Sequence, residues 1–117
     1  MSLPTVSQTF VDNQMATMRG RTTREWLAMP EWVKAELLDY VEFGRIEDGT
    51  TLTWALQNNW KMTVSYAGDD IWPIMRELMI VIVNYIPSWS QGSPEAYDEW
   101  IKMGGLRGAQ EKPDAEA

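Results

Sequence analysis

Catalytic chemistry in this chain would have to rest on carboxylate, lysine, serine or tyrosine side chains. The 117 residues include no His and no Cys, so the usual general base and the thiol nucleophile are missing. Asp69 and Asp70 are adjacent and could form an acid–base or metal-binding pair. They also precede an expected helix, where acidic side chains interact favourably with the helix dipole. We therefore interpret the pair as structural and predict a protein that is not an enzyme and has no catalytic residue, metal or cofactor.

Acidic side chains on one expected helix form the first candidate binding surface. A turn of about 100° per residue puts Glu31, Asp39 and Glu42 on the same side of a helix over residues 30–43. More acids follow nearby: Glu36, Glu47 and Asp48. The chain carries 17 acidic against 10 basic side chains, a net charge of −7, which disfavours direct contact with nucleic acid or an anionic membrane. We expect the acidic stripe to be exposed and to meet a basic surface of a partner protein, including one that normally binds nucleic acid.

A short basic segment precedes this helix. Arg19, Arg21 and Arg24 surround Gly20 and could contact phosphates or an acidic patch. Three charges give only a modest electrostatic footprint. We interpret the segment as a solvated linker.

Tryptophan is frequent, with seven Trp against two Phe. Trp60, Trp72 and Trp100 stand on or beside apolar stripes, and we expect them in the core. The other four stand near helix starts, on a polar face or in a loop: Trp26, Trp32, Trp54 and Trp89. Because Trp is favoured at binding interfaces, these four are the candidates for contact with a partner.

Two of these tryptophans complete the predicted partner-binding set. Trp54 projects from the polar side of its expected helix, and Trp89 stands in a loop between two helices. Together with the acidic stripe, the predicted partner-binding residues are Glu31, Asp39, Glu42, Trp54 and Trp89.

Helix start and stop signals indicate an all-α fold of about four to five helices. Thr22, Thr50 and Ser93 are suited to cap helix N-termini, and Gly44 is suited to end a helix in the left-handed conformation. The expected helical segments are a short turn from residue 22, then residues 30–43, 51–66, 71–85 and 94–103.

The apolar pattern predicts which helices are buried. Val33, Leu37, Tyr40 and Val41 share one stripe of the segment 30–43. The segment 71–85 is apolar on nearly all sides, so we expect it to be the central helix that the others cover. The alternative is a buried strand over residues 78–83, which contain several β-branched side chains, but the length of the apolar segment favours the helix.

The composition predicts one domain with polar ends. We expect a flexible N-terminal arm over residues 1–21, a helical domain over 22–105 and a disordered tail over 106–117. The most apolar stretch, residues 78–83, is far shorter than the about 20 residues of a membrane span, and the first residues lack the pattern of a signal peptide. We expect a cytoplasmic protein without membrane contact.

Several short motifs in a fixed order resemble a family of small phage and prophage proteins of undefined function. The similarity extends over residues 29–105 and rests on the order and spacing of these pieces: Met29-Pro30-Glu31-Trp32-Val33, Tyr40-Val41-Glu42-Phe43-Gly44, Leu56-Gln57-Asn58-Asn59-Trp60, Asn84-Tyr85-Ile86-Pro87, Gly92-Ser93-Pro94-Glu95 and Trp100. The chain departs from the family pattern at Asn59 and Trp60, where the family has Asp and Leu. The resemblance implies a phage setting in a bacterial host cell and supplies no catalytic residue.

The preferred functional hypothesis combines this setting with the exposed chemistry. We expect a non-enzymatic phage accessory protein, monomeric or homodimeric, that binds and modulates a host protein such as a CRISPR-type defence component. The alternative is a small-molecule-binding or sequestering protein with a Trp-lined pocket between its helices.

Overall fold

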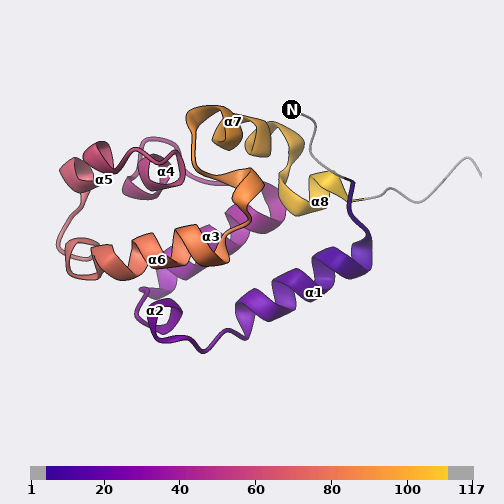
Figure 1. Ribbon diagram of the computed structural model, residues 1–117, viewed down its shortest axis with the longest axis horizontal. Helices are drawn as coiled ribbons and strands as arrows, with labels where there is room; N and C mark the ends of the chain where they lie inside the picture. The colour runs from indigo at the N-terminus through magenta and orange to yellow at the C-terminus, as the bar shows by residue number, and fades with distance from the viewer. Residues whose placement is uncertain (1–4, 111–117) are drawn as a thin grey trace, which may run out of the picture.

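The computed structural model describes residues 5–110, and all structural statements below refer to these residues. They form eight α-helices and two short 3₁₀-helices (Figure 1): α1 (Gln8–Arg19), α2 (Arg24–Leu27), α3 (Glu31–Phe43), α4 (Thr51–Leu56), α5 (Trp60–Tyr66), η1 (Trp72–Ile74), α6 (Met75–Tyr85), η2 (Ser88–Ser90), α7 (Pro94–Met103) and α8 (Gly105–Ala109). The predicted all-α class is confirmed, and the helix number exceeds the four to five that were expected.

Helix α3 supplies much of the core. Its predicted apolar stripe is confirmed, because Val33, Leu37, Tyr40 and Val41 are all fully buried. The helix follows Pro30 and ends at Gly44, whose φ of 67° is left-handed as expected. Helices α1 and α8 both pack against α3.

Helix α6 is not the fully covered central helix that its composition predicted. Leu78, Val81 and Ile82 are buried where α2 and α4 contact the helix. On the outer side, Met79 is 41% and Val83 63% exposed. Neighbouring helices therefore cover one face of α6 and leave the other open, as Figure 1 shows at the front of the molecule.

The expected helix over residues 51–66 is interrupted. Asn58 adopts a left-handed conformation with φ of 62°, which Asn tolerates better than most residues. The side chain of the next residue, Asn59, accepts a hydrogen bond of 3.2 Å from the backbone N–H of Met62 and so caps a new helix. The two asparagines thereby divide the segment into α4 and α5.

The N-terminal segment is folded, so the prediction of a flexible arm over residues 1–21 is wrong for the described part. Ser7 caps α1 by accepting a hydrogen bond from the N–H of Phe10. Val11, Met15 and Met18 recur at i, i+4 and i+7 and bury one face of the helix. Residues 1–4 lie outside the described residues.

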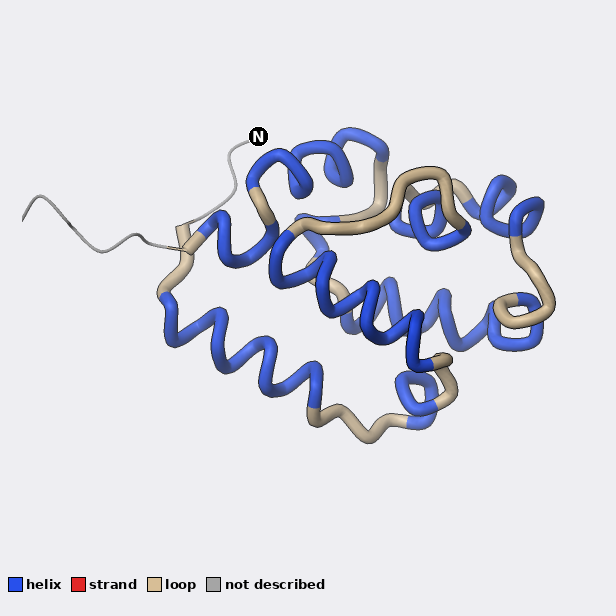
Figure 2. Tube along the Cα trace, turned by 180° about the vertical axis from the view of Figure 1, so that it is seen from behind, coloured by secondary structure: helices blue, strands red, loops and turns tan. Residues whose placement is uncertain are grey.

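The predicted C-terminal tail also begins with structure. Residues 105–109 form α8, with Leu106 and Ala109 buried, and α8 packs against α1, α3 and α7. The N–H of Val6 donates to the carbonyl of Ala109 at 2.9 Å, so the two ends of the described chain meet (Figure 2). A single bridge between Val6 and Gln110 is the only strand-like pairing within residues 5–110, and the expected tail over 111–117 lies outside them.

The backbones of α3 and α8 approach each other at two glycines. Gly105 has φ of 68°, and a Cβ atom added there would lie 2.5 Å from the backbone nitrogen of Gly44 and 2.7 Å from that of Phe43. No real side chain tolerates such contacts with backbone atoms, so residue 105 must be glycine for α8 to reach α3.

Gly105→Ala should therefore destabilise the fold much more than Gly49→Ala. Gly49 also has a left-handed φ, 77°, but a Cβ there would meet nothing within 4 Å. Both changes carry the cost of about 1–2 kcal/mol for a left-handed L-residue, and Gly105→Ala adds roughly 1–3 kcal/mol of overpacking. Urea unfolding followed by Trp fluorescence measures both losses, and equal losses would contradict the close approach of α8 to α3.

Candidate functional site

The predicted acidic stripe of α3 does not form one exposed surface. Glu31 and Asp39 are exposed as expected, but Glu42 is only 6% exposed. The expectation that Glu42 binds a partner is therefore wrong for this structure. The cause is that the arginines Arg19 of α1 and Arg107 of α8 reach Glu42 where these two helices pack against α3.

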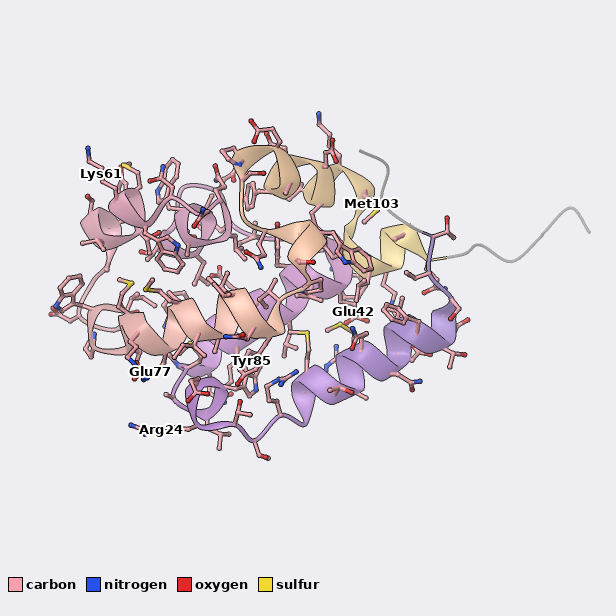
Figure 3. The ribbon with its side chains drawn as sticks, in the orientation of Figure 1. Arg24, Glu42, Lys61, Glu77, Tyr85 and Met103 are labelled. Atoms are coloured by element: carbon pink, nitrogen blue, oxygen red, sulfur yellow. The ribbon has the colours of Figure 1, made fainter. Side chains whose placement is uncertain are left out.

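Glu42 is held by two arginines, one from the first and one from the last helix of the described residues. Nη2 of Arg19, in α1, lies 2.7 Å from Oε1 of Glu42. Nε and Nη2 of Arg107, in α8, both lie 2.9 Å from Oε2. Figure 3 labels Glu42 where α1, α3 and α8 come together. We call this arrangement the Glu42 clasp.

Arg107 makes further contacts that fix its position. Its Nη2 donates to Asp12 of α1 at 2.8 Å, and its Nη1 donates to Gln110 at 3.0 Å. The hydrogen bond to Asp12, and after it the one to Glu42, raises the pKa of Arg107. Arg107 is therefore a permanent cation that joins α1, α3 and α8.

Two further acids of α3, Glu36 and Asp39, line a groove together with the loop that follows the helix. The groove has a volume of about 280 Å³ and is lined by Glu36, Asp39, Arg45, Ile46 and Glu47. We call it the acidic groove. None of its charged side chains takes part in an ion pair within residues 5–110.

Glu36 is the most unusual side chain of the acidic groove. Its Oε2 atom is shielded from solvent and has no hydrogen-bond partner among the described residues. Burial, and after it the negative charge of Glu47, raises the pKa of Glu36. The shielding of Glu36 was not predicted from the sequence, where Glu36 was noted only as an acid close to the predicted stripe.

Arg45 is the single cation of the acidic groove. Its guanidinium lies 4.5 Å from the centre of the Phe43 ring, a cation–π contact. The groove therefore holds three carboxylates and one arginine, and this arginine also contacts the Phe43 ring.

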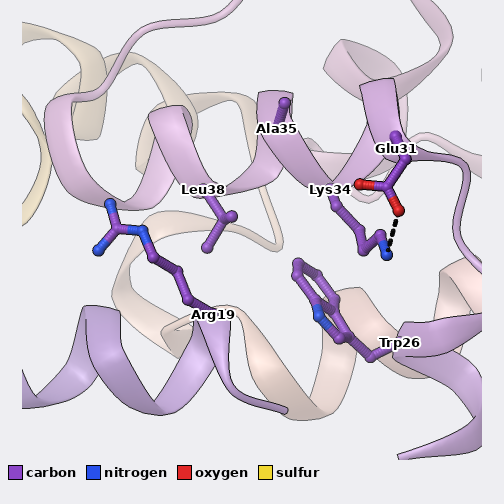
Figure 4. A pocket seen from close by; sticks show the side chains of 6 residues that line it. All are labelled: Arg19, Trp26, Glu31, Lys34, Ala35 and Leu38. Carbon is purple, nitrogen blue, oxygen red and sulfur yellow. Dashed lines mark ion pairs between the residues drawn. The ribbon is translucent and has the colours of Figure 1, made fainter. Parts of the chain in front are cut away.

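A second pocket lies on another side of α3, between α1, α2 and α3. Its volume is about 220 Å³, and it is lined by Arg19, Trp26, Glu31, Lys34, Ala35 and Leu38 (Figure 4). Glu31 pairs with Lys34 at 2.8 Å across its edge. We call it the Trp26 pocket. Trp26 is the one tryptophan among its lining residues, where the alternative hypothesis expected a Trp-lined pocket between helices.

Two arginines of the predicted basic segment contact other parts of the fold. Arg19 belongs to the Glu42 clasp, and the guanidinium of Arg21 lies 4.0 Å from the centre of the Tyr85 ring. Arg24 is exposed on α2. The prediction of a solvated linker is therefore wrong for Arg19 and Arg21.

The tryptophans divide differently from the prediction. Trp100 is fully buried as expected, but Trp72 is 58% exposed and Trp26 only 3% exposed. Trp72 projects from the surface because it lies in η1, outside the regular turn of α6 on which the prediction rested. Trp26 is buried because α2 packs against α6.

The other tryptophans are partly or largely accessible. Trp54 and Trp89, both predicted to bind a partner, and Trp60, expected in the core, are half-buried. Trp54 stacks on Tyr66 with ring centres 6.2 Å apart, and Trp89 packs edge-on against Trp100 at 6.0 Å. Trp32 is 43% exposed.

The buried tyrosines serve the packing of the core. The Tyr40 hydroxyl donates to the carbonyl of Ser90, and the Tyr97 hydroxyl donates to Asp48 at 2.9 Å. The rings stack at 5.7 Å, and burial raises the pKa of both phenols above the ordinary value. Both therefore stay protonated at neutral pH and act as fixed donors.

Two further findings concern metals and membranes. Within residues 5–110 there is no group of three or more acidic side chains close enough to hold a metal ion, and Asp69 and Asp70 are exposed in the turn before η1. None of the helices in this range has the length and apolar character needed to cross a membrane.

The Glu42 clasp and the Trp26 pocket were not predicted from the sequence, although one pattern in it pointed to the helix that both of them need. Val11, Met15 and Met18 have helical spacing after a Ser that can cap, and this predicts α1. Once α1 is predicted, it can cover one face of α3, and a buried acid on that face, such as Glu42, needs a cationic partner.

Comparisons with known proteins gave no relative: no family model, no curated protein and no solved structure matches this chain.

Removing the charge of Glu42 should destabilise the protein strongly. Glu42→Gln leaves Arg19 and Arg107 without their shared carboxylate. We expect the free energy of unfolding to fall by roughly 3 kcal/mol. This is the lower end for a broken buried ion pair, because both arginines also reach water. Glu31→Gln is the matched control on the same helix, since its carboxylate is 92% exposed and its loss should cost under about 1 kcal/mol. Urea unfolding compares the two, and a Glu42→Gln midpoint equal to that of the control would show that the clasp does not stabilise the fold.

Proposed function

We propose that this chain is a non-enzymatic binding protein that docks on a basic surface of a partner protein through the acidic groove. The observation that carries this proposal is the shielded Oε2 atom of Glu36, which has no hydrogen-bond partner among the described residues. A carboxylate oxygen that is shielded from water and has no donor makes the charged form of its side chain less favourable. A lysine or arginine side chain of a partner would supply both the missing donor and the opposite charge.

The surrounding charges favour the same kind of partner. Asp39 and Glu47 line the groove beside Glu36, against the single cation Arg45. The net charge of −7 adds a long-range field that attracts basic surfaces and repels polyanions. Such a field mainly raises the rate of association, and it is screened by salt.

We also propose that the protein binds its partner without catalysing a reaction. The chain has no His and no Cys. The buried phenols of Tyr40 and Tyr97 are engaged as hydrogen-bond donors. The groove offers carboxylates near one another but no nucleophile beside a base, which acyl or phosphoryl transfer would need.

The biological setting of the proposal comes from the resemblance to small phage proteins. In this setting the chain is a phage accessory protein in the cytoplasm of a bacterial host, and the partner is a host protein, such as a CRISPR-type defence component that binds nucleic acid. Its acidic groove then competes for a surface whose normal ligand is a phosphate backbone.

Reversing two charges of the groove should slow binding. Asp39→Lys with Glu47→Lys changes the groove and leaves the fold intact, because both side chains are exposed and unpaired within the described residues. The matched control is Glu95→Lys with Glu99→Lys, two exposed acids of α7 that give the same change in net charge. We expect the groove variant to associate about tenfold or more slowly, and the control only slightly more slowly.

Capture from bacterial lysate, followed by association kinetics with the recovered protein at two salt concentrations, measures this effect. The wild type and the α7 control should recover a common partner that the groove variant loses, and the wild-type rate should fall as salt rises. Equal recovery by the groove variant, or no partner for the wild type above empty beads, would contradict binding through the acidic groove.

A further inference from the structure

Helix α6 carries an apolar stripe that the rest of residues 5–110 leaves open. Met79 is 41% and Val83 63% exposed, and Trp72, in η1 at the N-terminal end of α6, is 58% exposed. Together with Arg76 they recur at intervals of four, three and four residues, which is the spacing of a seam between two packed helices. Figure 1 shows α6 at the front of the molecule with no helix before it. We call these four residues the α6 stripe.

The C-terminal end of α6 lacks the partners that usually end a helix. No hydrogen bond within the described residues reaches the backbone carbonyls of Val83, Asn84 or Tyr85. Pro87 follows and has no N–H to donate to Val83. The last turn of α6 also contains no basic side chain, although a cation there interacts favourably with the helix dipole. This end of α6 is therefore suited to a cation from another molecule.

Arg76 can be that cation when two copies of the chain meet. Its side chain is exposed and takes part in no ion pair among residues 5–110. In an antiparallel pair of α6 helices with a two-fold axis between Met79 and Ile80, Arg76 and Val83 lie equally far from the axis on opposite sides. Arg76 of each copy then lies beside Val83 at the open helix end of the other. The stripe is therefore complementary to itself in both shape and charge.

We infer that the α6 stripe binds a second copy of this chain, with the two α6 helices antiparallel. The same pairing brings Trp72 of one copy opposite the half-buried Pro87 of the other, so that apolar groups meet at both ends of the seam. A parallel pair would instead put the two Arg76 side chains next to each other, where like charges repel.

The size of the stripe determines the strength of this dimer. Residues 72–85 form a strip about 21 Å long and roughly 10 Å wide. Its area is a few hundred Å², less than the about 800 Å² per partner of a stable interface. We therefore expect a weak, reversible dimer with a dissociation constant of about 0.1 mM. The stripe shares no residue with the acidic groove, so this inference stands or fails independently of the proposed function.

Sedimentation equilibrium of the wild type between about 5 µM and about 1 mM tests the inference. The mean mass should rise with concentration from 13.5 kDa toward twice that value. Added salt should strengthen the association, because each copy has a net charge of −7 and screening reduces their repulsion. Binding of a basic partner in the acidic groove should show the opposite dependence on salt.

Two substitutions in the stripe should weaken the dimer at least tenfold, each against a control with the same change in net charge. Val83→Lys places a charge in the seam, and its control is Val64→Lys at a 45% exposed position of α5. Arg76→Glu places an acid at the C-terminal end of the other α6, and its control is Lys61→Glu in α5. All four positions are exposed, so the fold should remain intact.

Single introduced cysteines test the antiparallel register, because the chain has no Cys. Met79→Cys puts the two thiols beside the two-fold axis, close enough for a disulfide. Val83→Cys separates them by about 10 Å along the helices, which is too far. Mild oxidation should therefore produce a covalent dimer from Met79→Cys much faster than from Val83→Cys.

The opposite results overturn the inference. They are a wild type that stays monomeric at about 1 mM, a stripe variant that associates as well as its control, or cross-linking at position 83 as fast as at position 79. Association that weakens with salt would also overturn it, since this would indicate contact between the acidic groove and a basic side of another copy. The mass of the wild type needs no variant, so it decides the matter even if a substitution disturbs the fold.

Discussion

The fold depends on one buried carboxylate that must be paired. Glu42 has lost nearly all contact with water, and an unpaired charge in that state costs several kcal/mol. Its partners, Arg19 and Arg107, are 23 and 65 residues away in the sequence. Satisfying this charge therefore requires α1 and α8 to lie against α3, and it brings the two ends of the described chain together at Val6 and Ala109.

The clasp also determines which chemistry remains on the surface. Because Glu42 is used inside the fold, the acids that line the acidic groove are Glu36 and Asp39 of α3 and Glu47 of the following loop. Arg19 also lines the Trp26 pocket, and its charge there is paired with Glu42, as that of Lys34 is paired with Glu31. One helix thus carries a core face, a structural ion pair, an acidic groove and a small pocket on different sides.

Local patterns in the sequence predicted the parts of the fold that local interactions determine. The stripe of Val33 and Leu37, the left-handed Gly44 and the Ser93 cap of α7 all follow from neighbours within a few residues, and all are confirmed. The burial of Glu42 could not be predicted from neighbours in the sequence. It depends on Arg107, and α8 reaches α3 only through the close contact of Gly105 with Gly44. The exposed face of α6 was missed for a related reason, since an apolar composition does not show which sides of a helix its neighbours cover.

The central claim is that the N-terminal segment belongs to the cooperative fold and does not form a free arm. Amide hydrogen exchange measured residue by residue tests it most directly, because exchange reports the free energy of local opening. The clasp predicts that the buried amides of α1, such as those of Val11 and Met15, exchange as slowly as that of Leu37 in α3. Exchange of the α1 amides at the rate of an unstructured chain, while Leu37 stays protected, would contradict it.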